Sequence, residues 1–322
     1  MRDQNLTTAT ADMPAPTRIG SGDWLGSGRI NQKIIAFSFG QTSALMLRRL
    51  MDEHAKDFDN QFTVIYENTG KEHDATLDFG HEIETRWGVP IIWLEYCRQN
   101  NEHAWRVVNY QTAARRFDKR TPFDELLDWC ATLPNVRQRR CSGQLKERTK
   151  KRFLLSLGLE SWTDYIGIRY DEADRATEIR SAVPKYIGVK FPLIDAKITK
   201  KMVDDYWNAQ PFRLNIPNYQ GNCDLCFLKA KWKRLAIMEQ EPEAAKWWID
   251  QEARFAAKPG VTTGAHWIDG ITYAGLLAEA QHPQLNFNEP DIACSCVVGG
   301  YREAEDEEPN VGAEPPRKEK HE

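Results

Sequence analysis

The sequence predicts an α/β fold with a doubly wound, mostly parallel sheet and a helical, cysteine-containing C-terminal extension. Three observations carry this prediction. Short apolar runs typical of buried strands alternate with segments whose apolar residues have helical spacing. A turn rich in glycine and hydroxyl side chains follows the first apolar run. After residue 221 the composition shifts, and tryptophans gather among helical patterns flanked by paired cysteines.

Strand and helix signals alternate along the first half of the chain. The apolar run at 33–38 predicts a strand, and the spacing of apolar residues over 42–51 predicts a helix. The same reasoning predicts strands at 62–66, 89–94 and 162–168 and helices at 75–87, within 121–157 and from Thr199, a candidate N-cap, to 207. Ligands of such sheets bind at the carboxyl ends of the strands. The turns that begin at Ser38 and Asn68 are therefore candidate binding segments.

The composition predicts a cytoplasmic protein with one large domain and a smaller extension. Of the 322 residues, 41% are hydrophobic, and no apolar run approaches the ~20 residues of a membrane span. The first residues lack the apolar stretch of a secretory signal. We expect a flexible segment at 1–30, a nucleotide-binding domain at 31–220, a metal-binding extension at 221–300 and a disordered charged tail at 301–322.

Charge is distributed unevenly along the chain. The formal net charge is -4, yet residues 115–152 are strongly basic. Such a stretch suggests a phosphate-bearing partner, including nucleic acid, with a solvated helical face as the alternative. The chain also has seven cysteines. In a reducing compartment, closely spaced cysteines bind metal or perform redox chemistry more often than they form disulfides.

The turn after the first strand has the chemistry of an anion site. Backbone N–H groups at a helix N-terminus point toward a ligand, and hydroxyl side chains add further donors. Its residues are Ser38, Phe39, Gly40, Gln41, Thr42 and Ser43. This segment resembles the modified PP-loop of PAPS reductases, a Rossmann-like superfamily. Relative to the loop of ATP pyrophosphatases, Phe39 replaces a glycine and Thr42 replaces an aspartate, so the loop lacks a carboxylate for magnesium.

Further segments resemble the same family in the same order, over roughly residues 33–210. Asn68, Thr69 and Gly70 are similar to its Asp-Thr-Gly segment, with Asn68 in place of the aspartate. Residues 167–176 resemble a segment whose arginines hold sulfate and phosphate groups, as bidentate guanidinium groups do well. The resemblance implies that an adenine nucleotide (PAPS, APS or ATP) is bound by the loop and by Asn68, Thr69, Gly70, Lys146, Arg169, Glu172 and Arg175.

The cysteines have two competing interpretations. Cys223 and Cys226 form a CxxC, a spacing that lets two thiolates bind one metal. Cys141 precedes them at a distance similar to that in the iron–sulfur branch of the family. That resemblance implies a [4Fe-4S] cluster held by Cys141, Cys223, Cys226 and either Cys294 or Cys296. Zinc bound by the CxxC and the Cys294–Cys296 pair is the alternative, and ordinary buried thiols are a third interpretation.

The resemblance implies thiol-dependent reduction of a sulfonucleotide to sulfite, with a thiol or thioredoxin-type electron donor. In that reaction an accessible thiolate attacks the sulfate sulfur and an adenosine phosphate leaves. The family's C-terminal nucleophile segment is missing here, so Cys296 and Cys294 are the catalytic candidates. Two alternatives stay open: an adenine-nucleotide-dependent sulfur transferase acting on nucleic acid, and a non-catalytic nucleotide-binding protein with structural zinc.

Overall fold

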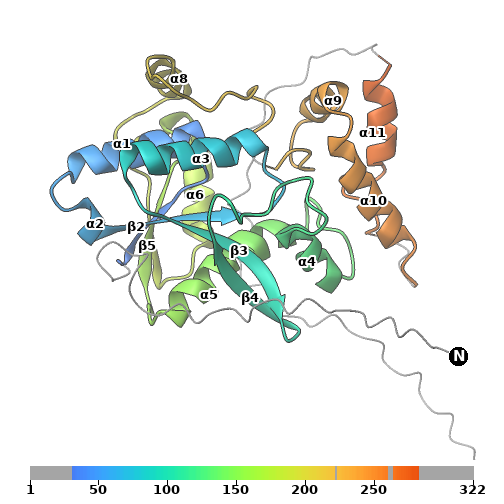
Figure 1. The fold of residues 1–322 in the computed structure, drawn as a ribbon, viewed down its shortest axis with the longest axis horizontal. Helices are drawn as coiled ribbons and strands as arrows, with labels where there is room; N and C mark the ends of the chain where they lie inside the picture. The colour runs from blue at the N-terminus through green and yellow to red at the C-terminus, as the bar shows by residue number, and fades with distance from the viewer. Residues whose placement is uncertain (1–30, 222, 260–263, 283–322) are drawn as a thin grey trace, which may run out of the picture.

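The computed structural model describes residues 31–221, 223–259 and 264–282 (Figure 1). Cys294, Cys296 and the segments expected at 1–30 and 301–322 lie outside the described residues. No helix among the described ranges is long and apolar enough to cross a membrane.

A six-stranded sheet forms the centre of the molecule. Its strand order is β4-β3-β2-β1-β5-β6, and every neighbouring pair is parallel except β3 and β4. The predicted doubly wound, mostly parallel fold is therefore confirmed. The strands are β1 (Lys33–Ala36), β2 (Phe62–Asn68), β3 (Ile91–Gln99), β4 (Glu102–Val108), β5 (Trp162–Ile166) and β6 (Ile187–Lys190).

The two edge strands, β4 and β6, were not predicted from the sequence. β4 is exposed or half-exposed along its whole length, and β6 has only four residues. A strand on the edge of a sheet needs no continuous apolar run, because one side of it meets solvent. The apolar-run signal therefore marks the central strands and misses the edges.

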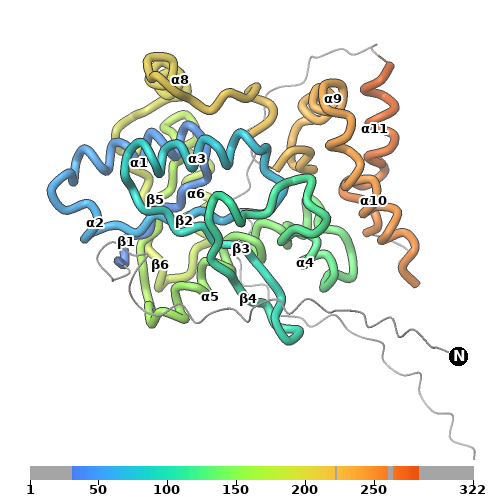
Figure 2. Tube along the Cα trace, in the orientation of Figure 1, coloured from blue at the N-terminus to red at the C-terminus, as the bar shows by residue number. Residues whose placement is uncertain are grey.

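Helices cover both faces of the sheet (Figures 1 and 2). Ile35, Val64 and Tyr66 pack with the helices of one face in one hydrophobic core. Ile34 and Ile65, one position away in the same strands, pack with the helices of the other face. The first face carries α1 (Gln41–Glu53), α3 (Asp74–Trp87) and α8 (Lys200–Asn208), and the second carries α5 (Thr149–Ser156) and α6 (Ala173–Ala182). This alternation follows from the two-residue period of a strand.

Several shorter helices connect these elements. The segment predicted as helical over 121–157 contains three pieces, and residues 130–140 separate the first from the others. Thr199 is the N-cap of α8 as predicted, although its side chain makes no capping hydrogen bond. The remaining helices of the first part are α2 (Phe58–Gln61), α4 (Pro122–Trp129), the π-helix η1 (Ser142–Arg148), the 3₁₀ helix η2 (Tyr170–Glu172) and α7 (Pro192–Asp195).

Within the described residues, three further helices follow residue 221: α9 (Lys231–Gln240), α10 (Ala244–Ala256) and α11 (Tyr273–Ala280). They lie beside α4 in Figure 1 and share one hydrophobic core with it. Trp248 and Trp267 are both fully buried in this core, where Trp267 Nε1 donates to the Trp248 carbonyl at 3.0 Å. Phe123 of α4 and Leu145 of η1 belong to the same core. The helices after residue 221 are therefore packed onto the sheet domain through a shared interior.

Candidate functional site

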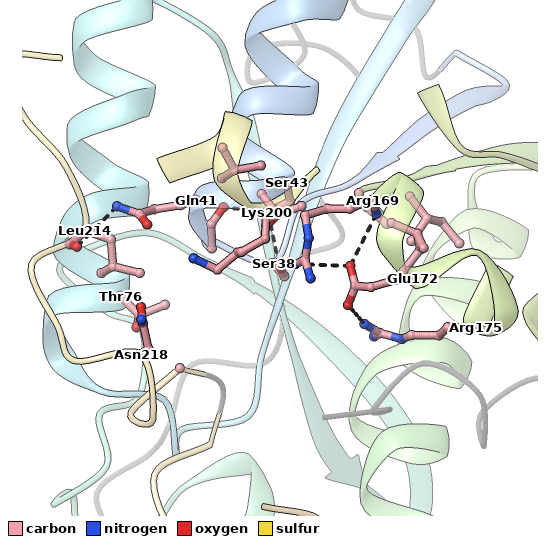
Figure 3. A pocket seen from close by; sticks show the side chains of 18 of the residues that line it. Ser38, Gln41, Ser43, Thr76, Arg169, Glu172, Arg175, Lys200, Leu214 and Asn218 are labelled. Atoms are coloured by element: carbon pink, nitrogen blue, oxygen red, sulfur yellow. Dashed lines mark hydrogen bonds and ion pairs between the residues drawn. The ribbon is translucent and has the colours of Figure 1, made fainter. Parts of the chain in front are cut away.

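A cavity of about 510 Å³ lies where the strand order reverses, between β1 and β5. Doubly wound sheets bind ligands at such a switch point. Residues at the carboxyl ends of β1, β2 and β5 contribute to its wall, among them Ser38, Glu67 and Gly167. The segment from Leu214 to Gly221 covers another side. Segments far apart in the sequence thus meet around one space (Figure 3).

The loop between β1 and α1 lines this cavity with five of its six predicted residues: Ser38, Gly40, Gln41, Thr42 and Ser43. Gly40 is the N-cap of α1, and the first turn of the helix carries no acidic side chain. Its first N–H groups lack acceptors within the helix. Ser38 Oγ and Ser43 Oγ lie 3.0 Å apart. The Ser43 hydroxyl donates to the Gly40 carbonyl at 3.0 Å. The loop therefore offers backbone N–H groups, the hydroxyls of Ser38 and Thr42 and a helix dipole to an anion.

Phe39, the sixth loop residue, lies outside the cavity lining. Its backbone is left-handed, with φ 55°, and its side chain is fully buried. The ring stacks on Tyr66 with centroids 3.6 Å apart and covers Gly80 so closely that a Cβ there would lie 2.3 Å from the ring. The phenylalanine thus fixes the loop to the hydrophobic core, and its side chain has no access to the cavity.

Two arginines predicted to hold an anion point toward the cavity. Glu172 lies between them: one carboxylate oxygen lies 3.2 Å from Arg169 Nη1 and the other 3.3 Å from Arg175 Nη1 (Figure 3). Arg169 also donates to Asp171 at 3.0 Å. All four side chains line the cavity. Glu172 therefore orients both guanidinium groups before any ligand arrives.

The π-helix η1 brings two more charged residues to the cavity, Lys146 and Glu147. Single π-helical turns occur often at functional sites. Lys146 Nζ lies 3.6 Å from the buried carboxylate of Glu72. Across the cavity as a whole, seven basic and four acidic side chains contribute to the wall. The excess of basic groups favours an anionic ligand.

A buried ion cluster forms part of the same wall. Lys150 is 2% exposed and lies 3.1 Å from Asp164, 3.7 Å from Glu147 and 3.8 Å from Glu67. Burial works against the charged amine, but the three carboxylates outweigh it and raise the pKa of Lys150. Burial also raises the pKa of Glu67, and the charge of Lys150 opposes that rise. Lys150 therefore stays charged, while Glu67 is the carboxyl here that gains a proton more readily than usual.

The Asn68–Gly70 turn does not line the cavity. Asn68 is fully buried, and its amide donates to Glu95 at 2.7 Å and to the Ala114 carbonyl at 2.9 Å. Its carbonyl oxygen accepts from the Gly70 N–H at 3.1 Å. Thr69 Oγ1 donates to the buried Glu72 at 2.8 Å. The turn predicted to contact the nucleotide instead holds its own backbone and the neighbouring strand in place.

Several lining residues had no place in the sequence-based site. Glu67 directly precedes the Asn-Thr-Gly turn, and Lys150 sits among basic residues that the sequence gives no means of separating. Lys200 also lines the cavity and is the first residue of α8, directly after the N-cap Thr199. The coil residues Asn218 and Tyr219 carry no motif at all. Glu67 and Lys200 therefore had a sequence signal, because each adjoins a predicted turn or N-cap. Lys150 and the coil residues had none, and tertiary packing brings them to the cavity.

None of the described cysteines lines the cavity. Cys223 pairs with Glu72 in an isolated β-bridge, and its sulfur lies 3.4 Å from Thr69 Oγ1. Cys226 is buried and Cys141 is half-buried. Within the described ranges, no three His, Cys, Asp or Glu side chains form a group that could hold a metal ion. Cys141, Cys223 and Cys226 therefore do not, by themselves, fit the predicted cluster.

The basic residues of the 115–152 stretch lie in different environments, and several form ion pairs. Arg116 is 7% exposed and pairs with Asp74 at 3.3 Å and Glu241 at 2.7 Å. Arg120 pairs with Asp128 at 2.8 Å. Lys150 belongs to the buried cluster described above. The stretch is thus divided between the interior, the cavity and the surface and does not form one continuous cationic face.

Comparisons with known proteins identify the family of this chain. The family model of the phosphoadenosine phosphosulfate reductase domain matches residues 32–215. The nin region protein ORF290 of Escherichia phage lambda is 28% identical over 216 residues, which cover 65% of this chain and 70% of that protein. The U34-tRNA thiolase NcsA of Methanococcus maripaludis, solved with its [4Fe-4S] cluster, superposes with a TM-score of 0.35 at 14% identity, covering 78% of this chain and 82% of that one. The family match spans more than half of the sequence, and the chain belongs to the phosphoadenosine phosphosulfate reductase domain family.

Proposed function

We propose that the cavity binds an adenine nucleotide and that the chain is an enzyme acting on the sulfur-bearing group of a sulfonucleotide such as PAPS or APS. One observation carries the proposal: the loop at 38–43, Lys146 and the Arg169–Arg175 segment, which come from three separate parts of the sequence, line the same cavity. A volume of about 510 Å³ lies within the usual range of small-molecule sites, roughly 300–1,000 Å³.

The charged groups of the cavity suit a ligand with two anionic parts. The helix N-terminus at Gly40 offers N–H donors to one phosphate. Arg169 and Arg175 offer planar guanidinium groups, held in place by Glu172, to a second phosphate or a sulfate. Because Glu172 orients both arginines in advance, little side-chain entropy is lost when the anion binds.

The parent reaction is thiol-dependent reduction of the sulfonucleotide to sulfite. A thiolate attacks the sulfate sulfur, an S–S bond forms, the S–O bond to the nucleotide breaks, and the adenosine phosphate leaves with the electron pair. Attack by a second thiol then releases sulfite and leaves a disulfide, so the two thiols supply the two electrons. Cys296 is the proposed attacking thiol, Cys294 is the alternative if it does not hold the metal, and a thiol or thioredoxin-type donor supplies the second thiol.

Nucleotide binding is tested by titrating the purified full chain with PAPS, APS and ATP in a calorimeter. Arg175→Ala removes a guanidinium from the cavity and should weaken binding of the preferred nucleotide about tenfold or more, the scale of a lost charge-assisted contact. Arg180→Ala is the matched control, because Arg180 is exposed on the same helix and is absent from the cavity lining. Equal affinities for the wild type and both variants would contradict the proposed site.

A second candidate is adenine-nucleotide-dependent sulfur transfer to nucleic acid. Glu67 and Glu147 support it, because they place carboxylates in a cavity whose loop lacks one at Thr42. Magnesium is commonly bound through one or two carboxylates together with substrate phosphates. Incubation of PAPS, APS or ATP with a thiol separates the candidates: sulfite with an adenosine phosphate indicates the reductase, AMP with pyrophosphate indicates the ATP-dependent transferase, and no product indicates a binding protein.

The proposed [4Fe-4S] cluster needs a ligand beyond the described residues, with Cys294 as the first candidate and zinc as the alternative metal. Metal analysis of anaerobically purified protein tests this directly. About four irons per chain with broad absorbance near ~400 nm would support the cluster. One zinc in a colourless protein would exclude it. None of the binding chemistry proposed above depends on that outcome.

A further inference from the structure

A coil segment that we call the strap, residues 214–221, forms one wall of the cavity. Leu214, Ile216, Pro217, Asn218, Tyr219 and Gly221 all line it. Residues 216–221 lie beyond the 32–215 match to the family domain. The strap has no helix or strand of its own, so contacts with neighbouring elements must fix its position.

Contacts hold the strap at both ends. At its start, the Leu214 carbonyl accepts a hydrogen bond of 3.5 Å from the Gln41 amide (Figure 3). Near its end, Lys229 Nζ donates to the carbonyls of Tyr219 and Gly221. Between these anchors, Gln220 points inward, is 5% exposed, and donates to Glu241 Oε1 at 3.1 Å. Glu241 is the C-cap residue of α9 and lines no part of the cavity.

Glu241 also lies close to the start of α3. His73 Nδ1 accepts from the Ala75 N–H at 3.1 Å, so its ring proton lies on Nε2, 3.5 Å from Glu241 Oε1. His73 is the N-cap of α3, and Thr76 in the first turn of that helix lines the cavity. Figure 3 shows Thr76 and Asn218 on the same flank. One carboxylate therefore contacts both the strap and the start of α3.

Arg116 forms an ion pair with the same carboxylate. Arg116 Nη1 lies 2.7 Å from Glu241 Oε2, while its Nε lies 3.3 Å from Asp74, the first residue of α3. The side chain of Arg116 is 7% exposed and that of Glu241 is 22% exposed. Charged pairs with little exposure are screened less by solvent than surface pairs and hold their geometry better.

We propose that Glu241 is a positioning residue for the nucleotide cavity: it ties the strap and the N-terminus of α3 to the helices after residue 221. The proposal rests on the proposed nucleotide function of the cavity. It gives these helices a role in ligand binding although they contribute little of the cavity wall themselves. Loss of the carboxylate should release Gln220 and let the strap move away from the ligand.

Two variants and one control test the proposal in the full-length protein. Glu241→Ala removes all three contacts, whereas Glu241→Gln keeps an oxygen for Gln220 but loses the charge that pairs with Arg116. Glu239→Gln is the matched control, because Glu239 is exposed on the same helix. The first readout is hydrogen exchange of the strap amides without nucleotide. The second is the dissociation constant of the nucleotide that the wild type binds, measured well below the unfolding temperature of every variant.

We expect strap exchange to be at least tenfold faster in Glu241→Ala, with nucleotide binding five- to tenfold weaker, Glu241→Gln intermediate and Glu239→Gln unchanged. A merely structural role would lower the unfolding temperature without changing affinity in the folded protein, and that result would overturn the proposal. Unchanged strap exchange in Glu241→Gln would also overturn it, even if the alanine variant fails to fold. A wild type that binds no nucleotide refutes the proposed function, and the exchange readout then still tests the tie to the strap.

Discussion

The loop at 38–43 and the turn at 68–70 stand at the carboxyl ends of neighbouring parallel strands, yet they do different things. The loop presents the exposed Ser38 hydroxyl and the first N–H groups of α1 to the cavity, whereas the buried Ser43 hydroxyl donates to the Gly40 carbonyl. The turn is buried, and its polar atoms are engaged with Glu95, Glu72 and nearby backbone groups. The comparison teaches that a position at a strand end is not sufficient for ligand binding. A polar side chain whose hydrogen bonds are already satisfied internally has none to offer a ligand.

The most disruptive change should be Asn68→Asp, which restores the residue typical of the family. The Asn68 amide is 2.7 Å from the buried carboxylate of Glu95. An aspartate there would bring two buried carboxylates together and leave the Ala114 carbonyl without its donor. We expect a loss of about 3 kcal/mol of unfolding free energy, measured by urea denaturation, because buried unpaired charge is costly.

A double-mutant cycle sharpens this prediction. Glu95→Gln in the Asn68→Asp background provides an amide that can donate to the new carboxylate, so part of the loss should be recovered. A coupling energy of about 1 kcal/mol or more would show that the two side chains act as one unit. Simple additivity of the two losses would refute the proposed reason for asparagine at this position.

Two glycines offer the next test. Gly70 has φ 72°, and a Cβ on it would lie 2.7 Å from Thr121 Cβ. Gly40 has φ -94°, and its nearest such contact is Ser38 Oγ at 3.6 Å. Gly70→Ala should therefore lower stability by about 1–3 kcal/mol, whereas Gly40→Ala should cost less than about 1 kcal/mol and weaken nucleotide binding. The reverse ranking in thermal unfolding would contradict the assigned roles.

Hydroxyl deletions compare the two segments at smaller amplitude. Ser38→Ala removes an exposed hydroxyl from the cavity wall and should weaken nucleotide binding about tenfold, with stability changed by less than about 1 kcal/mol. Thr69→Val removes the 2.8 Å bond to Glu72 and should cost about 1–2 kcal/mol with little effect on affinity in the folded protein. Calorimetric titration measures the nucleotide affinity of both variants, and denaturation measures their stability. If both variants changed affinity and stability to the same extent, the loop and the turn would not differ in role.

The smallest expected effect is a pH dependence that arises at Glu67. Burial raises its pKa, opposed by Lys150 and Lys146 and reinforced by Asp164. The folded state therefore binds this proton more tightly than the unfolded chain, so the ionised carboxylate costs stability above its raised pKa, and that cost disappears as the pH falls through it. The same protonation removes a negative charge from the cavity, so nucleotide affinity should rise. In Glu67→Gln this component should vanish from an affinity–pH profile, and an unchanged profile would exclude Glu67 as its origin.

Much of the fold followed from local patterns. The central strands and their covering helices were predicted because buried parallel strands are continuous apolar runs and amphipathic helices repeat every 3.6 residues. The edge strands β4 and β6 carry weaker signals, since each has one unpaired side. Of the residues predicted to bind the nucleotide, Ser38, Ser43, Lys146, Arg169, Glu172 and Arg175 line one cavity. Whether these residues bind a nucleotide stays a prediction.

What the sequence determined by itself was the alternation of central strands and helices, the hydroxyl-rich loop after β1 and the family, because these depend on residues close together along the chain. The tertiary structure alone decided which predicted residues reach the cavity. In the folded protein Phe39 and Asn68 are buried: Phe39 stacks on Tyr66, and Asn68 donates to the carboxylate of Glu95. The tertiary structure also brought residues 216–221 of the strap to the cavity, and Glu241 to the strap, from beyond the match to the family domain. Such contacts join residues distant in sequence, and no local periodicity encodes them.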